Sequence, residues 1–150
     1  ILDLSGDPPM RALAKQLVAD LETQGPVLMY TSYEKGGIGD LADMFPGIAG
    51  ELQAIINRLV DLHPVTKANY YHPDMLGSWS IKAVLPTIAP EMDYELLEGI
   101  NVGTEASSAY LEAINPETSE ERREEIRVEM LRYCKHDTAA MLKLVQFFAA

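Results

Sequence analysis

The sequence of 150 residues lacks a pair of cysteines, a long apolar run and an excess of basic residues, each of which marks a specialised class of protein. Its single cysteine, Cys134, cannot form an intrachain disulfide, which fits a reducing compartment. No apolar run approaches the ~18 residues that span a bilayer, and the N-terminus lacks the basic-then-apolar pattern of a signal peptide. We therefore expect a cytoplasmic protein with no membrane partner.

Basic residues are also scarce. Lys and Arg number 12 against 23 Asp and Glu, which gives a formal net charge of −11. This balance argues against a broad basic face that would hold nucleic acid or an anionic membrane. Any nucleic-acid chemistry would therefore need metal cations to mediate it.

The rest of the composition is that of an ordinary globular domain. Hydrophobic residues make up 47% and charged residues 23% of the chain, and a domain of this length buries roughly two-thirds of its unfolded surface. The chain shows no internal repeat and no domain boundary, which predicts one domain over residues 1–150. Because the sequence opens Ile1-Leu2-Asp3-Leu4 without an initiator Met, we expect it to be a fragment of a longer protein.

Apolar periodicity predicts mostly helices with a few short strands. Helices are expected over residues 8–24, 31–45, 48–59, 80–88, 104–114 and 119–148, with a helical turn over 94–98. Strands are expected at 27–30 and near 60–62, and an ordered loop over 65–78. The predicted fold class is a helix-rich α/β fold.

The last expected helix carries one acid on its apolar face. Spacings of three and four residues place a single stripe on that face: Ile126, Met130, Tyr133, Asp137, Ala140 and Leu144. A carboxylate on this stripe needs a partner, because an unpaired buried charge costs several kcal/mol. Asp137 is therefore either a structural residue held by hydrogen bonds or a metal ligand with the Tyr133 phenol beside it.

Two more acids lie near strand ends. Glu34 follows the strand at 27–30 by a few residues, where open α/β sheets gather ligands, and Asp61 is embedded in apolar sequence. Glu34 alone could simply favour a helix N-terminus. Taken with Asp137, these hard oxygen ligands favour Mg²⁺ or Mn²⁺ over zinc.

Other reactive residue types lack the spacing that a site requires. His63, His72 and His136 have no partner His or Cys pair at zinc-ligand spacing, so we expect turn residues or, for His136, a side chain off the stripe. The glycines at 36–39 match neither the P-loop nor the dinucleotide pattern. Cys134 has no evident base that would make it a nucleophile.

Four segments together resemble the bacterial family catalogued as domain of unknown function 2779. They are Tyr30-Thr31-Ser32-Tyr33-Glu34-Lys35, Arg58-Leu59-Val60-Asp61-Leu62, Gly77-Ser78-Trp79-Ser80-Ile81-Lys82-Ala83-Val84-Leu85-Pro86 and Tyr133-Cys134-Lys135-His136-Asp137-Thr138. The resemblance extends over nearly the whole chain. The family in turn looks like a branch of the ribonuclease-H-like DEDD exonucleases, which are named for four metal-binding acids in three motifs.

The resemblance implies roles for three residues. Tyr33-Glu34 matches the second exonuclease motif, in which Glu34 would be a metal ligand and Thr31 stands where Asn is usual. Tyr133 and Asp137 match the third motif, Tyr-x-x-x-Asp, in which the acid binds metal and the tyrosine orients the attacking water. Asp61 matches a recurrent acid for which we expect a local structural role with a buried, hydrogen-bonded carboxylate.

The first motif, Asp-x-Glu on an opening strand, does not occur in its expected place. Asp20-Leu21-Glu22 has the spacing, but it lies on the polar flank of an expected helix. The chain therefore looks like the C-terminal part of a ribonuclease-H-like nuclease domain that lacks the opening strands and carries two of the four acids. Alone, we expect it to bind metal weakly and to be inactive.

The implied activity is two-metal hydrolysis of phosphodiesters in DNA or RNA by 3′–5′ exonuclease chemistry, with Lys35 and Lys82 as candidate phosphate contacts. The alternative is a non-catalytic interaction module that retains a degenerate nuclease fold. The resemblance also implies that the strand at 27–30 pairs with 60–62 and has lost its other neighbour. We expect that free edge to self-associate or to be covered by Ile1–Leu4.

Overall fold

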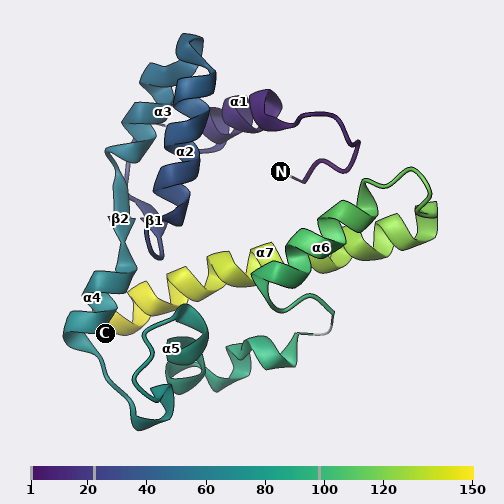
Figure 1. The fold of residues 1–150 in the computed structure, drawn as a ribbon. Helices are drawn as coiled ribbons and strands as arrows, with labels where there is room; N and C mark the ends of the chain where they lie inside the picture. The colour runs from purple at the N-terminus through teal and green to yellow at the C-terminus, as the bar shows by residue number, and fades with distance from the viewer. Residues whose placement is uncertain (1, 22, 98) are drawn as a thin grey trace. The chain divides into compact units, whose positions relative to one another are not determined.

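The computed structural model describes residues 2–21, 23–97 and 99–150. These residues form a helix-rich mixed α/β fold with a small sheet, as the sequence predicts (Figure 1). The chain divides into two compact units. The first comprises Pro8–Tyr71, and the second comprises Leu2–Asp7 and His72–Ala150.

The first unit holds the sheet and an apolar core of its own. Its elements are α1 (Met10–Asp20), β1 (Val27–Met29), α2 (Tyr33–Met44), η1 (Pro46–Ile48), α3 (Ala49–Ile56), β2 (Leu59–Asp61) and α4 (Leu62–Asn69). The core forms where α1, α2 and α3 pack together (Figure 1). Its buried side chains include Ala14, Leu52 and Ile55. Apolar burial of this kind supplies most of the stability of short helices.

The two strands run parallel, with Val27 opposite Leu59 and Met29 opposite Asp61. This confirms the predicted pairing of the segments at 27–30 and 60–62. The Val27 N–H donates to the Arg58 carbonyl over 3.0 Å, so in a parallel ladder the backbone groups of Leu28 face the opposite edge. Within the described residues the sheet has two strands, and this edge of β1 has no strand neighbour.

Arg58 ties the end of α1 to the start of β2. Its guanidinium donates to the carbonyl oxygens of Leu21, Gln24 and Gly25 at distances between 2.8 and 3.1 Å. These carbonyls belong to the turn after α1, where helical hydrogen bonding has ended. The fork of donors that arginine offers therefore fixes the connection between the helix and the sheet.

Three predicted boundaries between residues 8 and 78 are wrong. The helix expected over 8–24 ends at Asp20. The helix expected over 48–59 ends at Ile56, and Leu59 begins β2 instead of continuing the apolar helix face. The loop expected over 65–78 begins with α4 and includes the short helix η2 (Pro73–Met75). Asp61 caps α4 by accepting from the His63 N–H over 2.9 Å, and Pro64 fits a first turn, where its missing N–H costs nothing.

The second unit is almost entirely helical. Its remaining elements are α5 (Ile81–Ile88), η3 (Pro90–Met92), η4 (Tyr94–Leu96), α6 (Gly103–Ala113) and α7 (Glu120–Ala149). These confirm the helices predicted over 80–88, 104–114 and 119–148. Ser80 and Ser119 cap α5 and α7 with their side chains. No helix in the described residues has the combination of length and apolarity that crossing a membrane would need.

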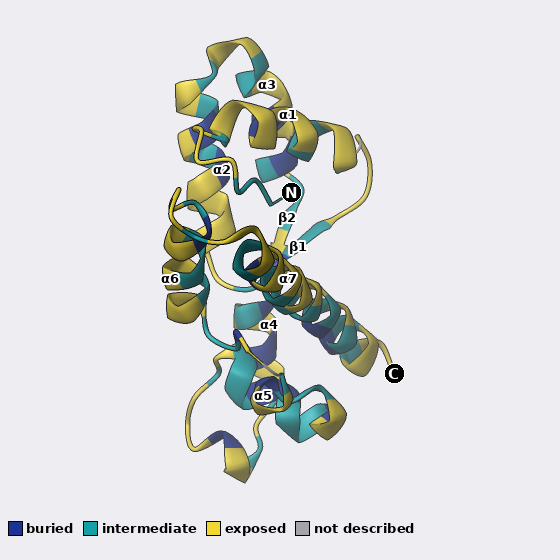
Figure 2. Cartoon of the chain, turned by 90° about the vertical axis from the view of Figure 1, so that its right-hand side faces the viewer, coloured by how far each residue is buried: buried dark blue, intermediate teal, exposed yellow. Residues whose placement is uncertain are grey.

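The predicted stripe on α7 faces the core of this unit. Ile126, Ala140 and Leu144 are fully buried, and Tyr133 and Asp137 are half-buried. In Figure 2 the buried residues of the helices are interrupted by exposed ones, as expected for amphipathic helices. Leu85, Ala89, Tyr94 and Ala140 form one core cluster, against which Tyr133 packs.

Candidate functional site

Asp137 lies next to two tyrosine side chains in the second unit, Tyr94 and Tyr133. The Tyr94 hydroxyl donates to its Oδ1 over 2.5 Å. The Tyr94 and Tyr133 rings meet edge to face with centroids 6.3 Å apart. Tyr94 is only 3% exposed, so it fixes one oxygen of the carboxylate from inside the core. Within the described residues Asp137 forms no salt bridge.

Both tyrosines stay protonated at neutral pH. Burial, followed by the hydrogen bond to Asp137, raises the pKa of Tyr94 far above its usual range. Burial and the charge of Asp137 also raise the pKa of Tyr133. A Tyr133 phenol in this state can orient a water molecule by hydrogen bonding, but it cannot act as a general base at neutral pH.

Lys82 belongs to the same group. It is the second residue of α5, and its Nζ donates to the Asn101 carbonyl over 2.5 Å. The ammonium also lies 5.0 Å from the centroid of the Tyr94 ring and 5.8 Å from that of Tyr133. Together, Lys82, Tyr94, Tyr133 and Asp137 are called the tyrosine cluster below.

His136 supports the tyrosine cluster from the side. Its Nε2 lies 2.9 Å from the Met92 carbonyl, and its ring packs edge to face on Tyr94 at 4.6 Å. His136 therefore links α7 to the short helices η3 and η4. The neighbouring Cys134 is exposed, and partial burial of its sulfur together with the Asp137 charge raises the thiol pKa, which disfavours the thiolate that a nucleophile needs.

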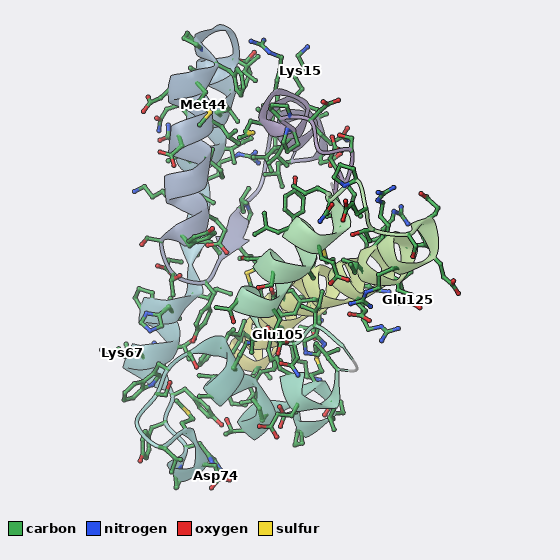
Figure 3. All side chains as sticks on the ribbon, turned by 45° about the vertical axis from the view of Figure 1, so that its right-hand side comes forward. Lys15, Met44, Lys67, Asp74, Glu105 and Glu125 are labelled. Carbon is green, nitrogen blue, oxygen red and sulfur yellow. The ribbon has the colours of Figure 1, made fainter. Side chains whose placement is uncertain are left out.

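Glu34 lies in the first unit. As the sequence predicts, it follows the end of β1 by a few residues, and it lies in the first turn of α2. It is exposed and lines a mostly apolar groove of about 530 Å³ between α1, β1 and α2. Met44, labelled in Figure 3, lies at the same groove. The preceding Tyr33 is 87% exposed.

Thr31 and Asp61 shape the turn that leads to Glu34. Thr31 has φ +75°, a left-handed conformation that is costly for a β-branched residue. Its N–H donates to Asp61 Oδ1 over 3.0 Å, and the same oxygen accepts from His63 N–H. The structural role expected for Asp61 fits these two hydrogen bonds, although its carboxylate is half-buried and not fully buried as predicted.

The structure thus brings Tyr133 and Asp137 together, and it places Glu34 in the other unit. No group of three or more His, Cys, Asp or Glu side chains within residues 2–21, 23–97 and 99–150 is arranged to hold a metal ion. As a hard oxygen donor that forms no salt bridge within the described part of the chain, Asp137 has chemistry that fits Mg²⁺ or Mn²⁺.

Sequence reasoning missed Tyr94 and Asn101. Tyr94 is separated from Asp137 by 43 positions, and Asn101 from Lys82 by 19. The one signal near Tyr94 is Asp93, which caps the helical turn that Tyr94 begins. A cap of this kind predicts the local helical turn and not the contact with Asp137. The contacts themselves depend on how α5 and α7 pack.

The family model described as a domain of unknown function (DUF2779) matches residues 2–80. The chain belongs to this family. The match includes Glu34 and Asp61 of the DUF2779 chain, whereas Tyr133 and Asp137 lie beyond it. No curated protein and no solved structure matches the chain.

Proposed function

We propose that the chain is part of a metal-dependent nuclease, a 3′–5′ exonuclease of the ribonuclease-H-like type that hydrolyses DNA or RNA. The observation that carries this proposal is Asp137, a half-buried carboxylate held by Tyr94 next to Tyr133, with no cationic partner among the described residues. A bound cation would neutralise this charge, because no basic side chain among the described residues forms a salt bridge with it.

In this proposal Asp137 and Glu34 would hold Mg²⁺ or Mn²⁺. When bound, such ions would supply an activated water and stabilise the charge on the leaving oxygen. The chain's own contribution is positional. Tyr94 orients the Asp137 carboxylate, and Tyr133 orients the water as a neutral phenol. Because Glu34 and Asp137 would share a site, their carboxyl oxygens are expected within roughly 8 Å of one another.

A manganese titration followed by NMR tests this proposal. Mn²⁺ broadens amide signals near its site, so substoichiometric Mn²⁺ should broaden the signals of residues 34 and 137 together. Glu34→Gln and Asp137→Asn should each weaken both effects. The exposed acids Glu51 and Glu117 provide matched controls, and Glu51→Gln and Glu117→Gln should change neither effect. Broadening at one residue without the other contradicts the shared site.

A cleavage assay complements the titration. With two of the four acids, the chain should bind metal weakly and leave labelled single-stranded DNA and RNA uncut in Mg²⁺ or Mn²⁺, because the ions lack ligands that hold their spacing. Strong Mn²⁺-dependent cleavage that Asp137→Ala abolishes would show instead a complete ligand set within this chain.

The second candidate function is a non-catalytic interaction module. Two observations favour it. Tyr94 already donates a hydrogen bond to one oxygen of the Asp137 carboxylate, and Glu34 borders an apolar groove. A module predicts no metal-dependent broadening at residues 34 and 137, so the same titration separates the two functions.

A further inference from the structure

Lys82 is held in place more firmly than an ordinary surface lysine. It is half-buried, its Nζ donates to Asn101, and two tyrosine rings lie next to the ammonium. Asn101 is fixed in turn, because its N–H donates over 3.2 Å to the carboxylate of Glu105, which is labelled in Figure 3. Lys35, the other lysine considered as a phosphate contact, is exposed on α2.

The charge of Lys82 is not paired with any carboxylate that the structure describes. Within the described part of the chain it forms no salt bridge, whereas Lys143 in the same unit pairs with Glu91 at 3.4 Å. A carbonyl oxygen and two aromatic rings stabilise an ammonium without neutralising it. The hydrogen bond to Asn101 uses one of three N–H donors, so donors remain for an anion from outside the chain.

Lys82 and Asp137 share their neighbours. Tyr94 donates its hydroxyl to Asp137 and offers its ring to Lys82, and the Tyr133 ring lies next to the same ammonium. An ammonium and a carboxylate therefore lie against the same two tyrosine side chains within the second unit. A phosphate that bridges a bound metal and an ammonium is a combination that phosphoryl-transfer sites use.

We propose that Lys82 binds a phosphate group of the nucleic-acid substrate beside Asp137. This inference rests on the proposed nuclease function, and it assigns the anion-binding part of the site to α5. The ligand class is a nucleotide phosphate, and a 5′-mononucleotide, the product of 3′–5′ hydrolysis, is its smallest form.

The test is a titration of the chain with deoxyadenosine 5′-monophosphate, followed by amide NMR at residues 82 and 101, in EDTA and again in Mg²⁺. Deoxyadenosine without phosphate is the ligand control. Lys82→Gln removes the charge, Lys82→Arg keeps it, and Lys143→Gln is the matched control at a paired lysine. Urea unfolding of each variant checks that the fold is intact.

In EDTA the nucleotide, and not the nucleoside, should shift both signals of the unmodified chain. Lys82→Gln should weaken that binding about 10-fold, the loss expected for one charge-assisted hydrogen bond, while Lys82→Arg and Lys143→Gln stay close to the parent. Equal nucleotide binding by Lys82→Gln and the parent, or no shift in the parent, overturns the inference.

The Mg²⁺ arm separates this result from the proposed function. Lys82-dependent binding that Mg²⁺ leaves unchanged supports the phosphate contact and counts against the metal site. Binding that Mg²⁺ strengthens but Lys82→Gln leaves unchanged supports the metal site and overturns the phosphate contact. If Lys82 only ties α5 to Asn101, Lys82→Gln lowers the unfolding free energy without changing nucleotide affinity, which also overturns the inference.

Discussion

At the scale of a single residue, Tyr94 contributes both to the stability of the fold and to the candidate site, because it is buried in the core and hydrogen-bonded to Asp137. Its hydroxyl is buried with the half-buried Asp137 carboxylate, and no sequence pattern paired these residues. Removing a hydrogen bond to a charged acceptor costs more than the average bond, because the remaining carboxylate loses its partner in a desolvated place.

Tyr94→Phe should therefore lower the free energy of unfolding by about 1.5–3 kcal/mol at pH 7. Urea denaturation measures this change. The control is Tyr33→Phe, since Tyr33 is 87% exposed, and its effect should stay within about 0.5 kcal/mol. Equal effects of the two substitutions would contradict the hydrogen bond as a source of stability.

The same residue predicts how stability depends on pH. Burial raises the pKa of Tyr94 in the folded chain, whereas an unfolded tyrosine titrates near its ordinary value of about 10. Above that pH the unfolded state loses a proton that the folded state keeps, so the unfolding free energy falls as pH rises. Below pH 10 this contribution is fully present. Tyr94→Phe should make the decline shallower, which denaturation at pH 9 to 11 would measure, and an unchanged decline would count against a buried Tyr94.

Thr31 shows backbone strain at the turn before Glu34. Asn tolerates the left-handed region better than a β-branched residue, so Thr31→Asn should raise the unfolding free energy by about 1 kcal/mol. The neighbouring Ser32 has φ −88°, and Ser32→Asn should give no such gain. Thermal or urea unfolding of both variants measures the difference. A destabilised Thr31→Asn chain would show that contacts of the threonine side chain contribute more stability than the backbone strain costs.

At the scale of elements, α2 forms although three of its twelve residues are glycine. The helix is held by the burial of Ile38 and Leu41 in the core of the first unit. Tertiary packing thus outweighs a poor helix propensity, because each glycine costs only about 1 kcal/mol relative to alanine.

Gly36→Ala should therefore stabilise the chain by about 0.5–1 kcal/mol. A Cβ at this position meets no atom within 4 Å, so the gain comes from reduced freedom of the unfolded chain. Gly99→Ala is the contrasting variant, since Gly99 has φ +83° and its Cβ would lie 2.6 Å from Glu129 Cδ. Unfolding experiments should show opposite signs for the two substitutions, and the same sign for both would contradict the argument.

At the scale of the whole molecule, the free edge of β1 is the feature with the largest consequence. Leu28 presents backbone donors and acceptors there, and the apolar groove beside the strand is lined by Leu13, Leu17 and Val27 among others. An edge of this kind pairs readily with another extended segment. The sequence predicts either self-association or cover by residues 1–4, of which Ile1 lies outside the described residues.

Sedimentation should therefore show a species heavier than the 16.6 kDa monomer, unless residues 1–4 cover the edge. Leu28→Lys places a charge on the edge and should shift an associated form to monomer. Leu76→Lys is the control, because Leu76 is 92% exposed and lies away from the strand in sequence. A strict monomer whose Leu28 amide exchanges rapidly with solvent would refute both forms of the prediction.

The sequence by itself determined most of the helices and the two strands, whereas their pairing was implied by the family resemblance and is present in the structure. Local signals carried the element predictions: the stripe on α7 and the apolar runs at β1 and β2. The start of α4 was not predicted, because the pair His63-Pro64 resembles a signal that ends an element. A proline in a first turn instead continues a helix when a preceding acid, here Asp61, caps it.

Tertiary structure alone decided which residues surround Asp137. The stripe placed Asp137 and Tyr133 on one face because their spacing follows the helical period. Tyr94, Lys82 and Asn101 come from segments whose side chains meet only when η4, α5 and the chain before α6 pack with α7. Helical periodicity carries no information about such contacts, because they depend on the fold's long-range packing and not on the order of neighbouring residues.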